Sequence, residues 1–239
     1  MRLDVLVTKS GLAESRERAQ ALILAGKVRV AGETVRRPDR SVSEDALIAV
    51  DSEPGYASRG ALKLAPALDQ FDVDPSGRVC ADIGASTGGF TDVLLRRGAA
   101  RVYAVDVGRG LLHWRLRQDP RVVVIERVNA RELESFSEAV TLVVIDVSFI
   151  SLDRILPAVR RAAPGAEVVA LFKPQFEVGR SEVGKGGIVR NQPATEAALG
   201  RFRSWCAASG YTVKGEAASQ VAGSEGNREI FVHLEPLER

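Results

Sequence analysis

A glycine-rich stretch at residues 82–91 contains the residue types and spacing that point most directly to chemistry. It follows an apolar, strand-like run and leads into an amphipathic helical pattern, and the next apolar run, 102–105, is followed by Asp106. Glycines let a backbone approach a ligand closely, and a carboxylate at the end of the second strand can accept hydrogen bonds from both hydroxyls of a ribose. The pattern therefore predicts a nucleoside-binding strand–turn–helix–strand unit.

The spacing of the glycines indicates which nucleoside is favoured. A dinucleotide site would show G-x-G-x-x-G with a pyrophosphate at the helix N-terminus. Here Asp82 precedes Gly84, and the next glycines are Gly88 and Gly89. This order resembles the D-x-G-x-x-x-G loop of S-adenosylmethionine (SAM) methyltransferases, which passes under the methionine moiety of SAM. The alternative is a glycine turn that serves only packing.

The resemblance to SAM methyltransferases implies a set of cofactor-binding residues. Asp106 would accept the ribose hydroxyls, and Asn129 would lie near the adenine unless it is simply a turn residue. The full set comprises Asp82, Gly84, Ala85, Ser86, Thr87, Gly88, Gly89, Phe90, Asp106, Asn129 and Asp146.

Four charged residues stand where the ends of the expected elements would bring them together. Lys63 lies in a helical segment before the glycine loop, and Glu229 begins the last strand-like run. Asp146 and Lys173 each follow a continuously apolar run. Ligands of open α/β sheets bind outside the carboxyl ends of the strands. Lys, Asp, Lys and Glu in this order resemble the catalytic tetrad of FtsJ-type RNA ribose 2′-O-methyltransferases.

That resemblance implies a role for each member of the tetrad. Lys173 would take the proton of a ribose 2′-hydroxyl or orient that hydroxyl, although a lysine ordinarily titrates near 10.4 and needs burial or a second cation to become a base. Lys63 would stabilise the negative charge that develops on the oxygen. Asp146 would orient Lys173 and favour a positive centre near the methyl group, and Glu229 would position Lys63 or the ribose. Taken singly, each residue is equally well explained by a surface salt bridge.

The elements that position these residues follow from the hydrophobic pattern. From residue 78 onward it predicts an α/β, Rossmann-like SAM methyltransferase sheet that ends in an antiparallel hairpin. Apolar runs such as 142–145 are typical of strands covered on both faces. Strands are expected at 78–84, 101–107, 121–126, 141–147, 166–173, 211–219 and 229–235, and helices at 58–71, 88–97, 152–162 and 193–209.

Residues 1–52 predict a separate small α+β domain. Ser15 suits the N-cap of a second helix, Gly26 suits the residue after that helix, and residues 31–32 suit a tight turn between two short strands. The first forty residues contain nine Lys or Arg and five Asp or Glu, whereas the whole chain has a net charge of only +2. This asymmetry predicts a basic face on the small domain. Residues 53–58 are expected to be a linker to the domain at 59–239.

Four phrases in this region, at 2–4, 11–16, 19–20 and 26–32, resemble an S4 RNA-binding domain. The resemblance implies recognition of folded RNA by shape and phosphate contacts. No aromatic residue lies in 1–52, so base stacking by this domain is not expected. The alternative is a docking module with a solvated basic face. The expected RNA-binding residues are Arg2, Arg16, Arg18, Lys27, Arg29, Arg36, Arg37 and, in the next domain, Arg59.

Four further phrases, at 58–64, 146–152, 173–177 and 186–190, resemble the TlyA family, which is also called hemolysin A and joins an S4 domain to an FtsJ-like methyltransferase domain. The resemblance implies SAM-dependent 2′-O-methylation of ribosomal RNA, with ribosomal subunits as partners and cytidine as the suggested target. Three alternatives stay open: another RNA such as tRNA, a membrane-active hemolysin, and a non-enzymatic RNA-binding or ribosome assembly factor.

Composition argues against several classes of protein. No apolar run approaches the ~20 residues of a membrane span, and the N-terminus begins as a helical pattern rather than as a signal peptide. Two cysteines and two histidines give no pattern of metal ligands. We therefore expect a cytoplasmic protein without a metal, whose cysteines are buried and reduced.

Overall fold

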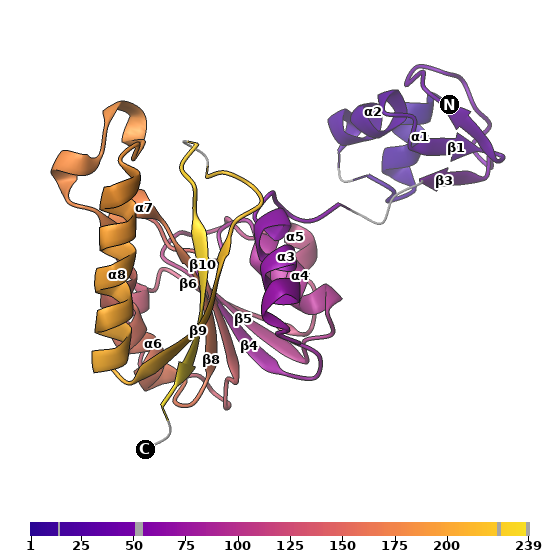
Figure 1. The fold of residues 1–239 in the computed structure, drawn as a ribbon. Helices are drawn as coiled ribbons and strands as arrows, with labels where there is room; N and C mark the ends of the chain where they lie inside the picture. Colours follow the sequence, from indigo (N-terminus) through magenta and orange to yellow (C-terminus); the bar gives the residue numbers. More distant parts are fainter. Residues whose placement is uncertain (14, 51–54, 224–225, 238–239) are drawn as a thin grey trace. The chain divides into compact units, whose positions relative to one another are not determined.

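The computed structural model describes residues 1–239 except 14, 51–54, 224–225 and 238–239 (Figure 1). The chain forms two compact units, Met1–Gly55 and Tyr56–Arg239. Part of the predicted linker, residues 53–54, lies outside the described residues. Ala57 belongs to the second unit, where its N–H donates to Asp92 Oδ2 at 2.8 Å, so the end of the expected linker is fixed to that unit.

The first unit is a small α+β domain, as the sequence predicts. Ser15 Oγ accepts a hydrogen bond from Arg18 N at 3.1 Å and so caps the second helix, which confirms its predicted place. Gly26, with φ +71°, follows that helix, and Ala31 and Gly32 form the tight turn with φ of +50° and +87°. Helices α1 (Leu3–Lys9) and α2 (Arg16–Leu24) accompany an antiparallel sheet of order β2-β1-β3, with strands β1 (Val28–Val30), β2 (Glu33–Val35) and β3 (Ile48–Val50).

The second unit contains a seven-stranded sheet of order β6-β5-β4-β7-β8-β10-β9. All neighbours from β6 to β8 are parallel, and β10 runs antiparallel to both β8 and β9. This confirms the predicted Rossmann-like methyltransferase sheet with its terminal hairpin. The strands are β4 (Val79–Ile83), β5 (Arg101–Asp106), β6 (Val122–Glu126), β7 (Leu142–Ile145), β8 (Glu167–Phe172), β9 (Tyr211–Ala218) and β10 (Ile230–Pro236).

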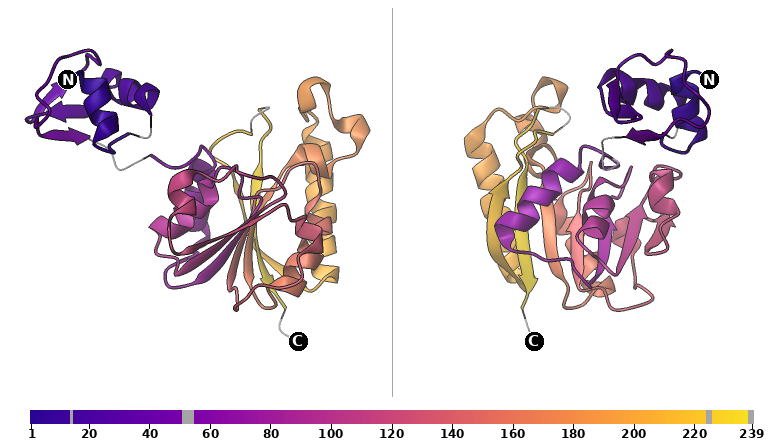
Figure 2. Two further views of the ribbon diagram at one scale, coloured as in Figure 1. Left: turned by 180° about the vertical axis from the view of Figure 1, so that it is seen from behind. Right: turned by 90° about the vertical axis from the view of Figure 1, so that its right-hand side faces the viewer.

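Helices cover both faces of this sheet and give three layers (Figures 1 and 2). On one face, α3 (Ala61–Phe71), α4 (Gly89–Arg96) and the short α5 (Trp114–Arg117) bury Leu64, Leu94 and Leu116 against the strands. On the other face, α6 (Leu156–Ala162) and α8 (Gln192–Ala208) bury Leu156 and Phe202. The central strands are therefore apolar on both sides, which explains their unbroken hydrophobic runs.

Some element boundaries differ from the prediction for local reasons. The expected helix at 152–162 is a 3₁₀ turn, Leu152–Arg154, followed by α6, because Pro157 fits only in the first turn of a helix. Helix α3 begins at Ala61 rather than at Ser58, whose Oγ accepts the N–H of Gly60 at 3.3 Å. The four-residue helices α5 and α7 (Pro174–Glu177) were not predicted, because they are too short to show a helical period.

Candidate active site

A cavity of about 530 Å³ lies at the carboxyl ends of β4, β5 and β7. Most of its wall is apolar, with Val105, Leu111 and Ile155 among the lining residues, as suits a purine ring. The predicted cofactor residues that line this cavity are Gly84, Ser86, Asp106, Asn129 and Asp146.

Gly84 sits where two strand ends approach each other closely. Its φ is +87°, and a Cβ there would lie 2.3 Å from the carbonyl oxygen of Asp146. Only glycine satisfies both conditions. The glycine therefore brings the end of β4 against the end of β7, and it leaves the loop backbone exposed to the cavity.

Asp106 is held in place by the loop that it faces. Its Oδ2 accepts from Ser86 N and its Oδ1 accepts from Gly108 N, each at 2.7 Å. Each carboxylate oxygen can accept a second hydrogen bond. The side chain is thus oriented and still able to accept hydroxyl donors. Asn129 also lines the cavity, and its Oδ1 accepts from Arg131 N at 3.2 Å.

The remaining predicted loop residues do not line this cavity. Asp82 is fully buried, and its Oδ2 accepts from Thr91 N at 2.8 Å and from Thr91 Oγ1 at 2.7 Å, which caps α4. Burial raises the pKa of Asp82 to about 7. Its place is therefore beneath the loop, and its contact is with the helix.

Packing explains the other loop residues outside the lining. Gly88 has φ +93°, and a Cβ there would meet the side chain of Leu116. Phe90 is buried with its ring centroid 6.0 Å from that of Phe231. The predicted residues that the structure leaves off the cavity wall are Asp82, Ala85, Thr87, Gly88, Gly89 and Phe90.

The tetrad forms two ion pairs, each between one buried and one half-buried side chain. Lys173 Nζ lies 2.5 Å from Asp146 Oδ1 and donates to Ser148 Oγ at 3.0 Å. Lys63 Nζ lies 2.5 Å from Glu229 Oε2. The lysine side chains are only 10% and 13% exposed, so neither pair is an ordinary surface salt bridge.

Strand pairing explains why these residues meet. In the antiparallel register of β8 and β10, Phe172 faces Ile230, so Lys173 and Glu229 extend from the next positions of the same two strands. Strand β7 pairs with β8 on the other side and brings Asp146 to the same edge. Lys63 reaches this edge from α3. The arrangement can place a cation next to a hydroxyl oxygen and hold it there with a carboxylate.

Two further residues at this edge were not predicted from the sequence. Ser148 contacts Lys173, and its position two residues after Asp146 was the signal that could have identified it. Phe149 has φ +65° and is 89% exposed beside the cavity, with its ring centroid 5.2 Å from that of Phe176. A bulky residue in this conformation is strained. Nothing in the sequence distinguishes such a phenylalanine from one in the core.

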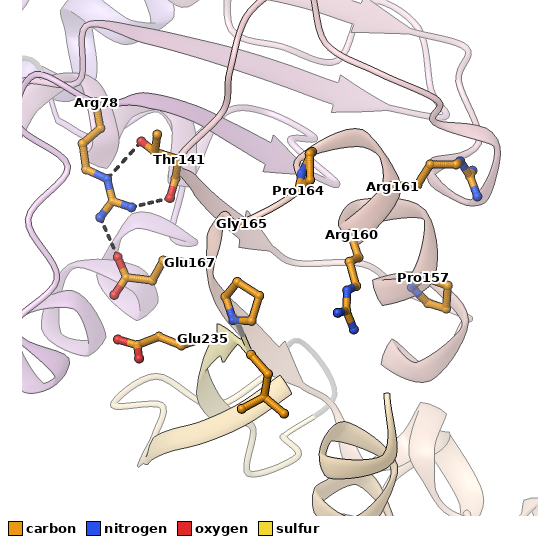
Figure 3. A pocket seen from close by; sticks show the side chains of 11 residues that line it. Arg78, Thr141, Pro157, Arg160, Arg161, Pro164, Gly165, Glu167 and Glu235 are labelled. Carbon is orange, nitrogen blue, oxygen red and sulfur yellow. Dashed lines mark hydrogen bonds and ion pairs between the residues drawn. The ribbon is translucent and has the colours of Figure 1, made fainter. Parts of the chain in front are cut away.

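A larger hollow of about 1210 Å³ lies at the opposite, amino ends of the strands (Figure 3). Arg78 there donates to Thr141 Oγ1 at 3.2 Å and pairs with Glu167 Oε2 at 2.5 Å. Among the described residues, Glu167, His233 and Glu235 also come close enough to share a metal ion. However, His233 lies 2.6 Å from Glu167, and Glu235 pairs with Lys214 at 3.0 Å. These ion pairs already engage the side chains that would bind the metal. The cluster also lies at the amino ends of the parallel strands, whereas ligands of this fold bind at their carboxyl ends.

The basic residues of the first unit fall into two groups. Arg18, Lys27, Arg29, Arg36 and Arg37 are exposed, as is Arg59 in the second unit. Arg2 and Arg16 are also exposed, but both pair with the buried carboxylate of Asp4, at 3.1 and 3.0 Å. No pattern in the sequence indicated that Asp4 would organise two of the predicted RNA-binding side chains.

Both cysteines are buried free thiols, as predicted. Burial raises the pKa of Cys80 and of Cys206 to about 12, so both are unreactive. In the part of the chain that the structure describes, no helix has the length and apolar character that crossing a membrane requires.

Comparison with known proteins matches both units. An S4 domain matches residues 1–48, and an FtsJ-like methyltransferase matches residues 56–235. The 16S/23S rRNA (cytidine-2′-O)-methyltransferase TlyA of Mycobacterium tuberculosis is 48% identical over 98% of this chain and 89% of its own length. Hemolysin A of Brachyspira hyodysenteriae is 41% identical over 98% of this chain and 99% of its own length.

A solved structure from Streptococcus thermophilus, of a protein named as a hemolysin, shares the fold across both units. Its TM-score is 0.75 at 43% identity, and the match covers 100% of this chain and 89% of that one. The two domain matches, the near full-length identity and the tetrad geometry agree with one another. The chain therefore belongs to the TlyA family, in which an S4 domain precedes an FtsJ-like methyltransferase domain.

Proposed function

We propose that this protein transfers a methyl group from SAM to the 2′-hydroxyl of a cytidine ribose in ribosomal RNA. The single observation that supports this most is the ion pair of the buried Lys173 with Asp146, which lines the cavity. The relatives named as rRNA (cytidine-2′-O)-methyltransferases suggest the acceptor.

The lining of the cavity supports SAM as the cofactor. Its apolar wall suits the adenine, Asp106 offers a carboxylate for the ribose hydroxyls, and Gly84 leaves space along the loop. Asn129 lies at the same wall and can accept or donate through its amide. When bound, SAM supplies a methyl group on a positively charged sulfur. Asp146 would favour positive charge near its own end of the cavity.

The tetrad supports proton removal from a hydroxyl. Lys173 would orient the hydroxyl, with Asp146 and Ser148 fixing the position of its Nζ, and it would take up the hydroxyl proton only as a neutral amine, after its own ammonium has given up a proton. Lys63 would stabilise the negative charge that develops on the oxygen, and Glu229 keeps its Nζ in place. Partial burial of both pairs lowers the local dielectric and strengthens these electrostatic effects.

Phe149 supports a nucleotide as the acceptor. An exposed aromatic ring beside the reacting groups offers a surface on which a nucleobase can stack, worth about 1–3 kcal/mol per base. Stacking would hold a base that has left its helix, so that its ribose can reach Lys173. The strained φ of Phe149 is consistent with a side chain held outward for binding.

The first unit supplies a basic face for the RNA. Its exposed cations lie on α2 and on the hairpin, and no aromatic residue accompanies them. Such a face suits phosphates of folded RNA, whose affinity depends on salt. We assign RNA affinity to this unit and chemistry to the second.

The test is methyl transfer from labelled SAM to defined acceptors. The full-length protein and a Lys173→Ala control would be incubated separately with small subunits, large subunits, intact ribosomes and tRNA. Nuclease digestion and mass spectrometry should then find 2′-O-methylcytidine in ribosomal RNA, and only with the unmodified enzyme. Label in tRNA alone would overturn the acceptor, and label on a base would overturn the ribose chemistry.

A further inference from the structure

The carboxylate of Asp4 accepts five hydrogen bonds within the first unit. It is fully buried, and Arg2 Nε and Nη2 both donate to it at 3.1 Å. Arg16 Nε donates at 3.0 Å, Gln20 Nε2 at 2.8 Å and the N–H of Val5 at 3.0 Å. These hydrogen bonds, with that of Arg2 first, hold the pKa of Asp4 well below its usual range, so the group stays ionised.

This network leaves two arginines side by side and half exposed. Arg2 Nη2 and Arg16 Nε donate to the same oxygen, Oδ2, and the two side chains are 46% and 51% exposed. One carboxylate neutralises only one of the two cations. Within the described part of the chain, Arg2 Nη1 and both Nη nitrogens of Arg16 have no hydrogen-bond partner. The pair therefore presents several N–H donors in a fixed geometry, and the exposed carboxylates of Asp39 and Glu17 act on the charges of Arg2 and Arg16 from nearby.

We propose that Arg2 and Arg16 form a single clamp for one RNA phosphodiester and that Asp4 is its positioning residue. The inference rests on the proposed RNA-methylating function and deepens it. A guanidinium that is already immobilised loses little rotamer entropy on binding, and guanidinium forks match phosphate oxygens. A shared anchor therefore yields one strong contact instead of two weak and mobile ones.

The clamp and simple electrostatics predict opposite effects of Asp4→Asn on RNA affinity. Asp4→Asn removes a negative charge from an RNA-binding face, which by charge alone should tighten RNA binding. If Asp4 positions the arginines, the variant should bind deproteinised ribosomal RNA about tenfold more weakly, because a charge-assisted contact is lost. The matched control is Asp45→Asn. Asp45 is exposed and accepts a hydrogen bond from Ser43 rather than from an arginine, and its loss should leave affinity unchanged or slightly tighter.

The salt dependence of binding distinguishes one clamp from two independent contacts. Each phosphate contact contributes about 0.7–0.9 to the slope of log affinity against log salt. Arg2→Ala, Arg16→Ala and the double variant should all lose about one such increment, because one phosphate is released in each case. Two independent contacts would instead give about twice that loss in the double variant, and this would overturn the clamp.

All variants are tested as full-length protein, with circular dichroism melting to check the fold. If Asp4→Asn unfolds the first unit, Gln20→Ala keeps the carboxylate and its arginines, and its RNA affinity should stay near that of the wild type. The arginine series then decides the matter. Asp4→Asn that folds and binds as well as the wild type overturns the inference. Wild-type protein that fails to bind ribosomal RNA overturns the proposed function instead.

Discussion

Lys173 contacts the carboxylate of Asp146 and the hydroxyl of Ser148, and these two residues, not Lys173, line the cavity. Its removal should therefore affect chemistry more than cofactor binding. We expect Lys173→Ala to lower methyl transfer by about 10²- to 10⁴-fold, the usual contribution of a positioned acid–base group. SAM affinity measured by calorimetry should stay nearly unchanged.

Lys214 gives the control for that experiment. It lies on β9 and forms a half-exposed ion pair with Glu235 of β10, outside the tetrad. Lys214→Ala should retain full methyl transfer. If Lys173→Ala kept activity within a few-fold of the wild type, the assignment of Lys173 as base or orienting group would be incorrect.

Asp106 should contribute mainly to cofactor affinity. Asp106→Ala is expected to weaken SAM binding by about 10- to 150-fold, because a charge-assisted hydrogen bond to a ribose hydroxyl is lost. The carboxylate also accepts from Ser86 N and Gly108 N, so loss of loop structure must be separated from loss of ligand contact. Asp106→Asn retains one acceptor oxygen for the loop, and calorimetry should place its affinity between the other two. Equal affinity in all three proteins would remove Asp106 from the SAM site.

At the residue scale, the sequence could predict which side chains meet where the order of the strands alone brings them together. Asp146, Lys173 and Glu229 meet because parallel strands end at one edge and the final hairpin returns there. It could not predict that Asp82 lies beneath the glycine loop, because a motif does not show which way a side chain points. Nor could it predict Asp4, whose five hydrogen bonds depend on how α1 and α2 pack.

At the element scale, Glu177 joins α7 to the 3₁₀ turn that precedes α6. Its Oε1 accepts the N–H of Leu152 at 2.8 Å, and burial raises its pKa to about 7. The folded protein therefore holds this proton more tightly than the unfolded chain does, and stability should fall as the pH rises from about 4.5 to 7. Glu177→Gln keeps an acceptor oxygen for Leu152 but removes the titration.

The expected result is that Glu177→Gln gains stability relative to the wild type as pH rises, by up to about 3 kcal/mol above pH 7. Below about pH 4.5 the pH-dependent part of this difference should vanish. Urea unfolding at several pH values measures it, and Glu182→Gln, at an exposed position, should show no comparable trend. A difference that does not change with pH would mean that Glu177 is not protonated in the folded state.

The hydrophobic pattern predicted all seven strands and the four longer helices described in the second unit. A continuous apolar run, in a chain with helices between such runs, is typical of a buried strand. Short elements were missed for the converse reason. Helix α7 depends on Pro174 at its first position and on the contact of Glu177 with Leu152, which is a tertiary interaction. Periodicity cannot report either feature.

At the scale of the whole molecule, we expect RNA affinity and catalysis to separate between the units. Arg18→Ala/Lys27→Ala removes two exposed cations outside the Asp4 network and should lower the salt slope of rRNA binding by about 0.7–0.9 per lost contact. SAM affinity should be unaffected, and turnover should largely recover at saturating RNA.

Filter binding over a range of salt concentrations, together with initial rates at high RNA, measures both effects. Unchanged affinity and slope would show that these two cations are simply solvated. Normal binding with lost turnover would mean that the first unit orients the target, and that the two roles are not separate.

The ion pair of Lys63 with Glu229 joins residues that are 166 positions apart. Glu229 directly precedes β10, the last strand of the chain, which inserts between β8 and β9. During translation the first unit, with its own core, can fold as soon as it emerges, whereas Lys63 has no partner until almost the whole chain has been made. Under the proposed function, a nascent or prematurely terminated product would thus bind RNA without modifying it, and would compete with the finished enzyme for that RNA.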